Sequence, residues 1–180
     1  MKIGITNDHR GVNRKKEIIK YLRSKGYEVI DFGPNSPESV DYPIYAFDIG
    51  KRISNKEVDL GILLCGTGVG MCIAANKVNG VRCANLNNIK EARLAHQHNN
   101  ANAIALASDM SMIRIKDILD EFLKAKFSDE ERHIRRVNLI DSYINEPVAV
   151  TNNSFVNKDE ISAENNRSEE YISQVDSNDN

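Results

Sequence analysis

A cysteine and a hydroxyl lie within a glycine-rich turn, in the stretch ILLCGTGVGMCIAANK at residues 62–77. Cys65 ends an apolar run, and Thr67 follows just before a pattern that predicts a helix. Three glycines allow positive φ angles and close approach of a ligand, and they are Gly66, Gly68 and Gly70. Because the first N–H groups of a helix attract anions, this turn is a candidate anion-binding site. The alternative interpretation is a tight strand-to-helix connection without a ligand.

Three well-known phosphate-binding patterns do not fit this turn. The dinucleotide pattern G-x-G-x-x-G fails because its third glycine comes one place early, at Gly70. The phosphate-loop pattern G-x-x-x-x-G-K-[ST] fails because no lysine follows the glycines before Lys77. A cysteine phosphatase of the low-molecular-weight type would need an arginine where this chain has Met71. What remains is a thiol beside main-chain donors.

Such a thiol can act as a nucleophile or a base. Amides and a helix N-terminus lower the pKa of a thiol from about 8.5 toward neutrality. The same donors can stabilise an oxyanion that forms about 3 Å away. A base beside an oxyanion cradle is equipped to remove a proton alpha to a carbonyl. The alternative for Cys65 is a buried core thiol, which is also our interpretation of Cys72 and Cys83 because they fall inside a helix and a strand.

Two further residues with acid–base chemistry follow the first predicted strand. Asp8 and His9 precede Gly11, so we expect both side chains to reach a crevice from a tight turn. The alternative for Asp8 is a helix cap.

Histidines and arginines nearer the C-terminal end of the chain could also contribute to a site. His96 and His98 are two apart on a predicted helix and point about 200° from each other, so this pair cannot chelate one metal ion. We therefore expect no metal site. Arg132 and Arg136 are one helical turn apart and form a fork that suits a phosphate monoester. The alternative for this pair is a solvated helix surface.

The elements that position these residues alternate along the chain. Predicted strands and helices follow each other at 2–6 and 11–25, 27–33 and 43–54, 58–65 and 69–77, 80–86 and 88–99, and 101–108 and 111–126, with a last helix at 129–146. This alternation predicts an α/β fold, a three-layer Rossmann-like open parallel sheet of about five strands with helices on both faces. Ligands of such sheets bind outside the carboxyl ends of the strands, where Cys65 and Asp8 are expected. The apolar face of the last helix predicts a second subunit as its partner.

Composition limits the function further. The chain has 180 residues, 41% of them hydrophobic, and a net charge of −2. These values favour a single domain that binds a small ligand over a protein that binds nucleic acid or membranes. Residues 1–146 are predicted to be that domain. Residues 147–180 contain seven asparagines and seven acidic residues against two basic ones, which predicts a disordered tail. Without a long apolar run or a signal-peptide pattern, we expect a cytoplasmic protein.

The motifs together carry a family resemblance. They are Asp8-His9-x-Gly11, DYP at 41–43, CGTGVG at 65–70, AANK at 74–77, HN at 98–99, and the arginines at 132 and 136. Over residues 1 to about 145 the chain resembles the type B ribose-5-phosphate isomerase family, which includes galactose-6-phosphate isomerase subunits. The resemblance implies interconversion of ribose 5-phosphate and ribulose 5-phosphate through an enediolate, without a metal or an organic cofactor.

The resemblance also implies roles for individual residues. Cys65 would be the base and would lie in an anion hole lined by Gly66, Thr67, Gly68 and Gly70. His98 and Asp8 would assist ring opening and proton transfer on the sugar oxygens. The phosphate would be held by His9, Arg132 and Arg136. The sugar would be contacted by Tyr42 and Asn99. Family members are dimers or dimers of dimers with shared sites, so some residues among His98, Asn99, Arg132 and Arg136 would come from the neighbouring subunit.

Two positions depart from the common family pattern. Asn100 stands where many members have an acidic residue, and Asp109 stands where many have an arginine. An acidic group near the phosphate would repel a dianion, which leaves a hexose 6-phosphate, such as allose or galactose 6-phosphate, as an alternative substrate. A non-catalytic sugar-phosphate or nucleotide sensor is the alternative of another class. Because Asp8, His9, Cys65 and His98 are all present in one chain, we expect a homo-oligomer.

Overall fold

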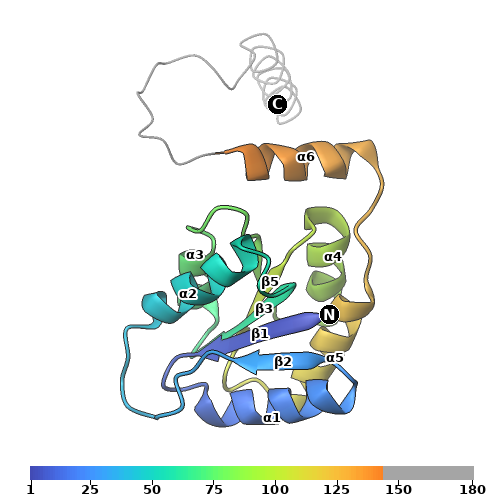
Figure 1. Cartoon of the computed structure of the whole chain (residues 1–180). Coiled ribbons are helices and arrows are strands. Elements are labelled where there is room, and N and C mark those ends of the chain that lie inside the picture. The colour runs from blue at the N-terminus through green and yellow to red at the C-terminus, as the bar shows by residue number, and fades with distance from the viewer. Residues whose placement is uncertain (144–180) are drawn as a thin grey trace, which may run out of the picture. The chain divides into compact units, whose positions relative to one another are not determined.

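A five-stranded parallel sheet forms the centre of the protein in a computed structural model that describes residues 1–143 (Figure 1). The elements are β1 (Lys2–Asn7), α1 (Val12–Ser24), β2 (Glu28–Asp31), α2 (Tyr42–Ser54), β3 (Leu60–Cys65), α3 (Val69–Ala75), β4 (Cys83–Asn85), α4 (Ile89–Asn99), β5 (Ala103–Ala107), α5 (Met112–Lys124) and α6 (Glu131–Ser142). The predicted alternation and fold class are thereby confirmed. The predicted tail at 147–180 lies outside the described residues.

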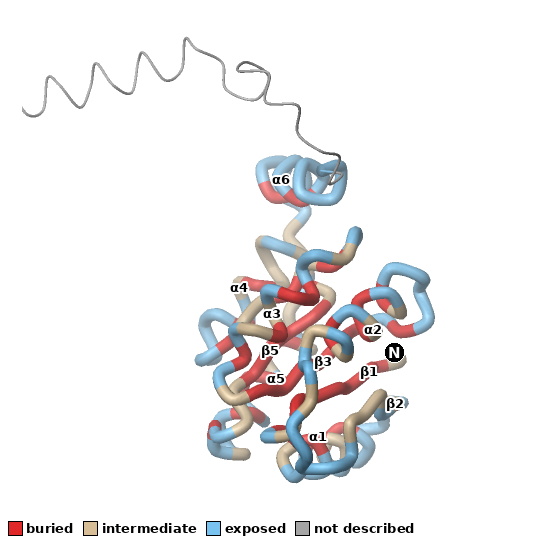
Figure 2. Tube along the Cα trace, turned by 90° about the vertical axis from the view of Figure 1, so that its left-hand side faces the viewer, coloured by how far each residue is buried: buried red, intermediate tan, exposed pale blue. Residues whose placement is uncertain are grey.

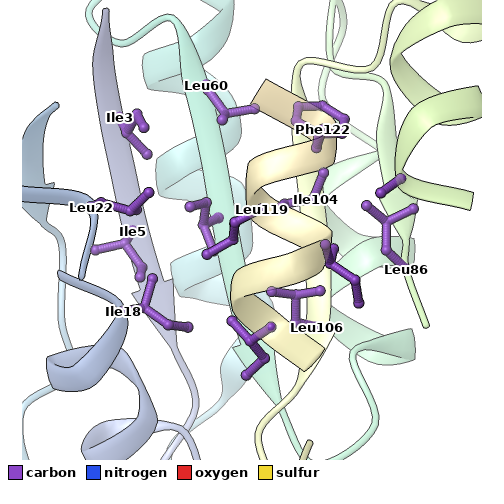
Figure 3. Packing of buried hydrophobic residues seen from close by; sticks show 14 of the residues in the cluster. Ile3, Ile5, Ile18, Leu22, Leu60, Leu86, Ile104, Leu106, Leu119 and Phe122 are labelled. Carbon is purple, nitrogen blue, oxygen red and sulfur yellow. The ribbon is translucent and has the colours of Figure 1, made fainter. Parts of the chain in front are cut away.

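The sheet has the strand order β2-β1-β3-β5-β4, and all neighbouring strands are parallel. Because side chains alternate between the two faces of a strand, each strand supplies both apolar layers. Alternate residues of β3, such as Ile62 and Leu64, pack with α1, α4 and α5 (Figure 3). The other alternate residues of β3, Leu63 and Cys65, pack with α2 and α3 on the other face. The helices therefore cover both faces of the sheet.

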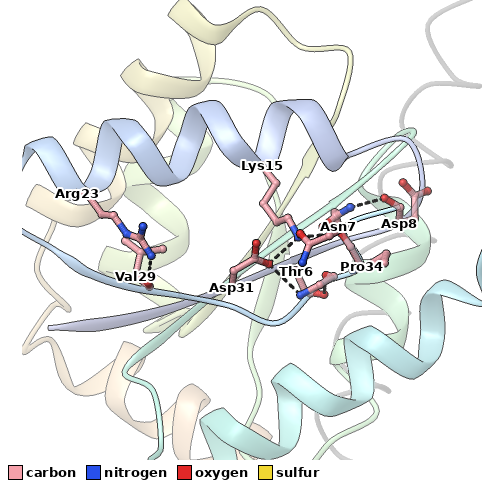
Figure 4. Close-up of polar contacts among 10 residues, drawn as sticks. Thr6, Asn7, Asp8, Lys15, Arg23, Val29, Asp31 and Pro34 are labelled. Carbon is pink, nitrogen blue, oxygen red and sulfur yellow. Dashed lines mark hydrogen bonds and ion pairs between the residues drawn. The ribbon is translucent and has the colours of Figure 1, made fainter. Parts of the chain in front are cut away.

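A buried lysine fastens the loop that follows β2. Lys15 has no exposed surface, and its Nζ contacts Asp31 Oδ1 at 2.6 Å, Pro34 O at 2.8 Å and Asn35 Oδ1 at 3.0 Å (Figure 4). A buried ammonium is stable only when its donors are paired, and here three oxygens accept from it. Lys15 thus holds this loop against α1, at the carboxyl edge of the sheet.

Helix α6 differs from the other helices because most of its surface is exposed (Figure 2). Only His133 and Val137 are buried in it. A pair of short contacts ties its end to the main body, from Arg82 Nη1 to the two carboxylate oxygens of Asp141 at 2.7 and 2.8 Å. None of the helices within residues 1–143 is long and apolar enough to cross a bilayer.

Candidate active site

The topology places a switch point between the carboxyl ends of β1 and β3. From β1 the chain passes outward to β2 on one side, whereas β3 lies on the other side, so chain order reverses at this point. Open parallel sheets bind ligands at such a switch point. The Asp8 N–H donates to Leu64 O at 2.8 Å, which joins the segment after β1 to the end of β3. Residues that are distant in sequence, Asp8 and Cys65, are thereby brought to one edge.

Cys65 is the last residue of β3 and is 6% exposed. Its sulfur accepts a hydrogen bond from the Gly68 N–H at 3.1 Å. Part of its surroundings is apolar, since it packs in the cluster beneath α2 and α3, as expected for a core thiol. The amide contact is what distinguishes Cys65 from an ordinary core cysteine, because it orients a main-chain dipole toward the sulfur.

The conformation of Gly68 explains how the amide reaches the sulfur. Gly68 has a φ of 80° and precedes the first residue of α3, so the chain turns sharply back at this point. A Cβ at this position would overlap Asn85 Oδ1 and lie 3.2 Å from the main chain of Leu106. Glycine is therefore required by both the left-handed conformation and the space.

Other predicted residues surround the same turn. Thr67 is exposed, and its Oγ1 accepts from the Val69 N–H at 3.3 Å. Tyr42, the first residue of α2, lies against Gly70, where a Cβ would be 2.9 Å from the phenol oxygen. The Tyr42 hydroxyl therefore reaches the N-terminus of α3, next to the Cys65 turn.

Asp8 and His9 differ in how their polar atoms are used. Asp8 is buried, and its Oδ1 accepts from the main-chain N–H groups of Arg10 at 2.8 Å and Gly11 at 3.2 Å. These contacts close the turn before α1, whose N-cap is Gly11 without a side-chain cap hydrogen bond, so the capping alternative for Asp8 is wrong. His9 is half-buried, and within residues 1–143 its buried Nδ1 has no hydrogen-bond partner. His9 therefore retains an unsatisfied polar atom in the turn after β1.

The other predicted site residues lie at the opposite edge of the sheet. Helix α4 returns from the carboxyl end of β4, so His98 and Asn99 at its end lie where β4 and β5 begin. The Nε of Arg82, which precedes β4, donates to Asn100 O at 2.9 Å in agreement with this placement. Asn99 also lines a pocket of about 220 Å³ together with Arg82 and Cys83.

Helix α6 carries the two predicted arginines at that same edge. The His98 ring stacks on His133 of α6, with ring centroids 4.2 Å apart and an angle of 27° between the planes. Burial lowers the pKa of His133, and the neighbouring charge of His98 lowers it further. Arg132 and Arg136 are exposed, and Arg132 Nη2 pairs with Glu130 Oε2 at 2.8 Å.

One chain alone does not bring the two groups together. The six residues of β3 span about 16 Å at the usual rise of a strand, and this length separates the two edges. Asp8, His9, Tyr42 and the turn at 65–70 form one group. The second group consists of His98, Asn99, Arg132 and Arg136.

Several residues of these groups are absent from the sequence prediction. Asn85 lies beneath Gly68, and His133 stacks on His98. Arg10 lies over Gly66, where a Cβ would be 3.2 Å from its Nη1. The position of Arg10 directly after Asp8 and His9 was a usable signal, whereas the contacts of Asn85 and His133 depend on tertiary packing.

The two remaining cysteines are free thiols close to each other, of which Cys83 is buried and Cys72 is half-buried. Cys72 Sγ lies 3.2 Å from Cys83 O. A hydrogen bond with the Cys83 side chain lowers the pKa of Cys72 to about 7, despite the opposing effect of burial. Within residues 1–143, no three side chains of histidine, cysteine, aspartate or glutamate are arranged to hold a metal ion.

Comparison with known proteins gives a consistent result. The model of the Ribose/Galactose Isomerase family matches residues 3–140. A Mycoplasma genitalium protein named probable ribose-5-phosphate isomerase B is 46% identical over 147 residues, covering 78% of this chain and 94% of that protein. The Clostridium thermocellum ribose-5-phosphate isomerase B structure matches with a TM-score of 0.76 and 46% identity, over 78% of this chain and 95% of that one. The Mycoplasma genitalium ribose-5-phosphate isomerase B structure with bound ribulose 5-phosphate matches with a TM-score of 0.73 and 45% identity, over 78% and 93%.

Proposed function

The chain belongs to the ribose/galactose isomerase family, and from this membership we propose that it interconverts ribose 5-phosphate and ribulose 5-phosphate. We assign this activity to the domain at 1–146. The observation that carries the proposal is the Gly68 amide directed at the Cys65 sulfur, at the switch point of the sheet. Support for the substrate comes from the relative whose structure contains ribulose 5-phosphate.

The proposed reaction is a proton transfer between two neighbouring carbons. Cys65 as thiolate removes the proton from C2 of the open-chain aldose, and the electron pair forms the C1–C2 double bond of an enediolate. The thiol then returns the proton to C1, which gives the ketose. Amides at the start of α3, with Thr67 and Tyr42 beside them, would donate to the enediolate oxygens. Asp8 and His98 would move protons on the sugar oxygens.

We place the complete site between two copies of the chain. His98, Asn99, Arg132 and Arg136 of one subunit would enter the crevice of the other, with the arginines and His9 holding the phosphate. The separation of about 16 Å within one chain, set by the length of β3, supports this arrangement, as do exposed apolar side chains near both edges. Those residues are Ile44, Phe47, Val69 and Ile73 on α2 and α3, and Ile134, Leu139 and Ile140 on α6. An isologous dimer would cover both sets.

A second candidate substrate is a hexose 6-phosphate. The family description names galactose as well as ribose, and the acidic Asp109 is exposed just after β5, at the crevice edge. The kcat/KM values for ribose, allose and galactose phosphates separate the two candidates, because kcat/KM measures relative transition-state binding. A higher value for a six-carbon substrate would overturn the pentose assignment.

Deuterium exchange from solvent tests the chemistry itself. We expect the wild-type protein to exchange the C2 proton of ribose 5-phosphate with solvent deuterium, and we expect Cys65→Ala to lose that exchange. A non-catalytic sensor would bind the sugar phosphate and leave the C–H bond intact. Binding without exchange in the wild-type protein would therefore contradict the isomerase proposal.

A further inference from the structure

The side chain of Arg10 lies over the turn that contains the candidate base. Its main-chain N–H donates to Asp8 Oδ1 at 2.8 Å, which fixes the residue at the end of β1. Its guanidinium covers Gly66, because a Cβ there would be 3.2 Å from Arg10 Nη1 and 3.4 Å from Cδ. Since Gly66 directly follows Cys65, Arg10 reaches the Cys65 turn from the segment after β1, the strand next to β3.

The positive charge of Arg10 is not used within the described chain. Over residues 1–143, no carboxylate lies within ion-pair distance of its guanidinium, and the guanidinium donates no hydrogen bond. Arg14, one turn further along, is different because it pairs with Glu17 and donates to Ser108 O at 3.3 Å. Arg10 is therefore the guanidinium available to a ligand at this edge.

Two carboxylates of the same chain lie at this edge of the sheet. Asp8 lies at the end of β1, and Asp109 follows β5 at the same edge, where the Ser108 N–H donates to Cys65 O at 2.8 Å. A sugar phosphate adds further negative charge. The two predicted arginines of α6, Arg132 and Arg136, lie at the opposite edge, so within one subunit they cannot balance this charge.

We propose that Arg10 is a further substrate-binding residue that contacts the phosphate group of the sugar phosphate. This inference rests on the proposed function and names a determinant of its substrate class. A guanidinium presents a planar fork of donors that matches a phosphate, and Arg10 is exposed enough to turn toward one. It would favour phosphorylated over unphosphorylated sugars and offset the repulsion from Asp109.

The test compares Arg10→Ala, Arg10→Lys and the control Arg93→Ala. The substitution Arg93→Ala removes the same charge from an exposed position on α4, where Arg93 Nη1 is 3.9 Å from Glu121 Oε1. A hydrogen-bonded pair of charged groups is worth enough that Arg10→Ala should raise KM roughly 10- to 100-fold, with kcat within about twofold. Arg10→Lys keeps the charge but loses the fork, so its KM should be intermediate. Arg93→Ala should match the wild type.

Binding of inorganic phosphate, followed by calorimetry, separates this inference from the proposed function because it needs no turnover. We expect Arg10→Ala to weaken phosphate binding by a similar factor. Unchanged KM and phosphate affinity would make Arg10 a surface residue, and a loss of kcat at constant KM would move its contact to the reacting oxygens. Either result overturns the inference. If the wild type binds phosphate through Arg10 but isomerises no sugar phosphate, the proposed function fails while the assignment of Arg10 stands.

Discussion

The main-chain N–H of Gly68 donates to the sulfur of Cys65 over 3.1 Å, three residues away along a turn that only glycine can form. This contact fixes the direction of the sulfur and points a main-chain N–H at it. It also links the proposed chemistry to the fold, because the same turn starts α3.

Replacing Cys65 by Ala should abolish most activity without unfolding the protein. We expect kcat for ribose 5-phosphate to fall on the order of 10²- to 10⁴-fold, which is the usual contribution of a general base. A coupled assay measures the rate, and circular dichroism with thermal unfolding verifies the fold. Because the alanine keeps the main-chain turn, substrate binding should persist. A variant that retains wild-type kcat would remove Cys65 from the mechanism.

Replacing Gly68 by Ala should destabilise the fold itself. Gly26 is the matched control, since its φ of 87° is similar and nothing lies within 4 Å of a Cβ there. Gly26→Ala should cost about 1–2 kcal/mol, the penalty of a left-handed alanine. Gly68→Ala should cost about 1–3 kcal/mol more, because its Cβ overlaps Asn85 and crowds Leu106. Urea unfolding measures both free energies, and equal values would mean that the turn yields without strain.

Stability should fall as the solution is acidified, through His133. Burial and the neighbouring charges of His98, Arg132 and Arg136 lower the pKa of His133 from its ordinary value of 6.5, and burial also lowers that of His96. The unfolded chain then binds more protons than the folded chain near and below pH 6.5. The stabilisation is therefore complete above about pH 6.5 and is lost as the pH falls.

Thermal unfolding between pH 7.5 and pH 5 checks this dependence. His133→Gln removes the titrating group, so its melting temperature should depend less on pH than that of the wild type. An identical pH dependence in the two proteins would show that His133 carries none of the effect.

The sequence was sufficient to predict the sheet and the group of residues at its carboxyl edge. Apolar runs and helical periodicity are local, and each predicted strand and helix is present. Asp8, Cys65 and Gly68 were predictable because they lie at or just after the ends of strands. Periodicity does not determine strand order, however, so it could not place Arg10 over Gly66, which requires β1 beside β3.

Packing also determines contacts that the sequence pattern does not predict. Lys15 shares the apolar stripe of Ile18 and Leu22, which was a signal of burial, but its three oxygen partners come from the end of β2 and the loop after it. The stack of His98 on His133 likewise depends on how α6 returns to α4. Such contacts join segments that no local pattern relates.

Subunit complementation tests whether the site is shared. Cys65→Ala and His98→Asn each remove one residue from a different edge of the chain, so each variant alone should be nearly inactive. In a mixed dimer one site carries both substitutions and the other carries neither. Random reassociation of equal amounts should therefore restore roughly a quarter of the wild-type activity.

The control for this experiment mixes Cys65→Ala with Cys65→Ser. Every site of that mixed dimer lacks the cysteine, so no activity should return, and any recovery would point to contamination or to a side reaction. If Cys65→Ala with His98→Asn also recovers nothing after verified subunit exchange, His98 and Cys65 do not meet across an interface. The two groups of residues, about 16 Å apart in one chain, would then not form one site between subunits, and the proposal of a shared site would be wrong.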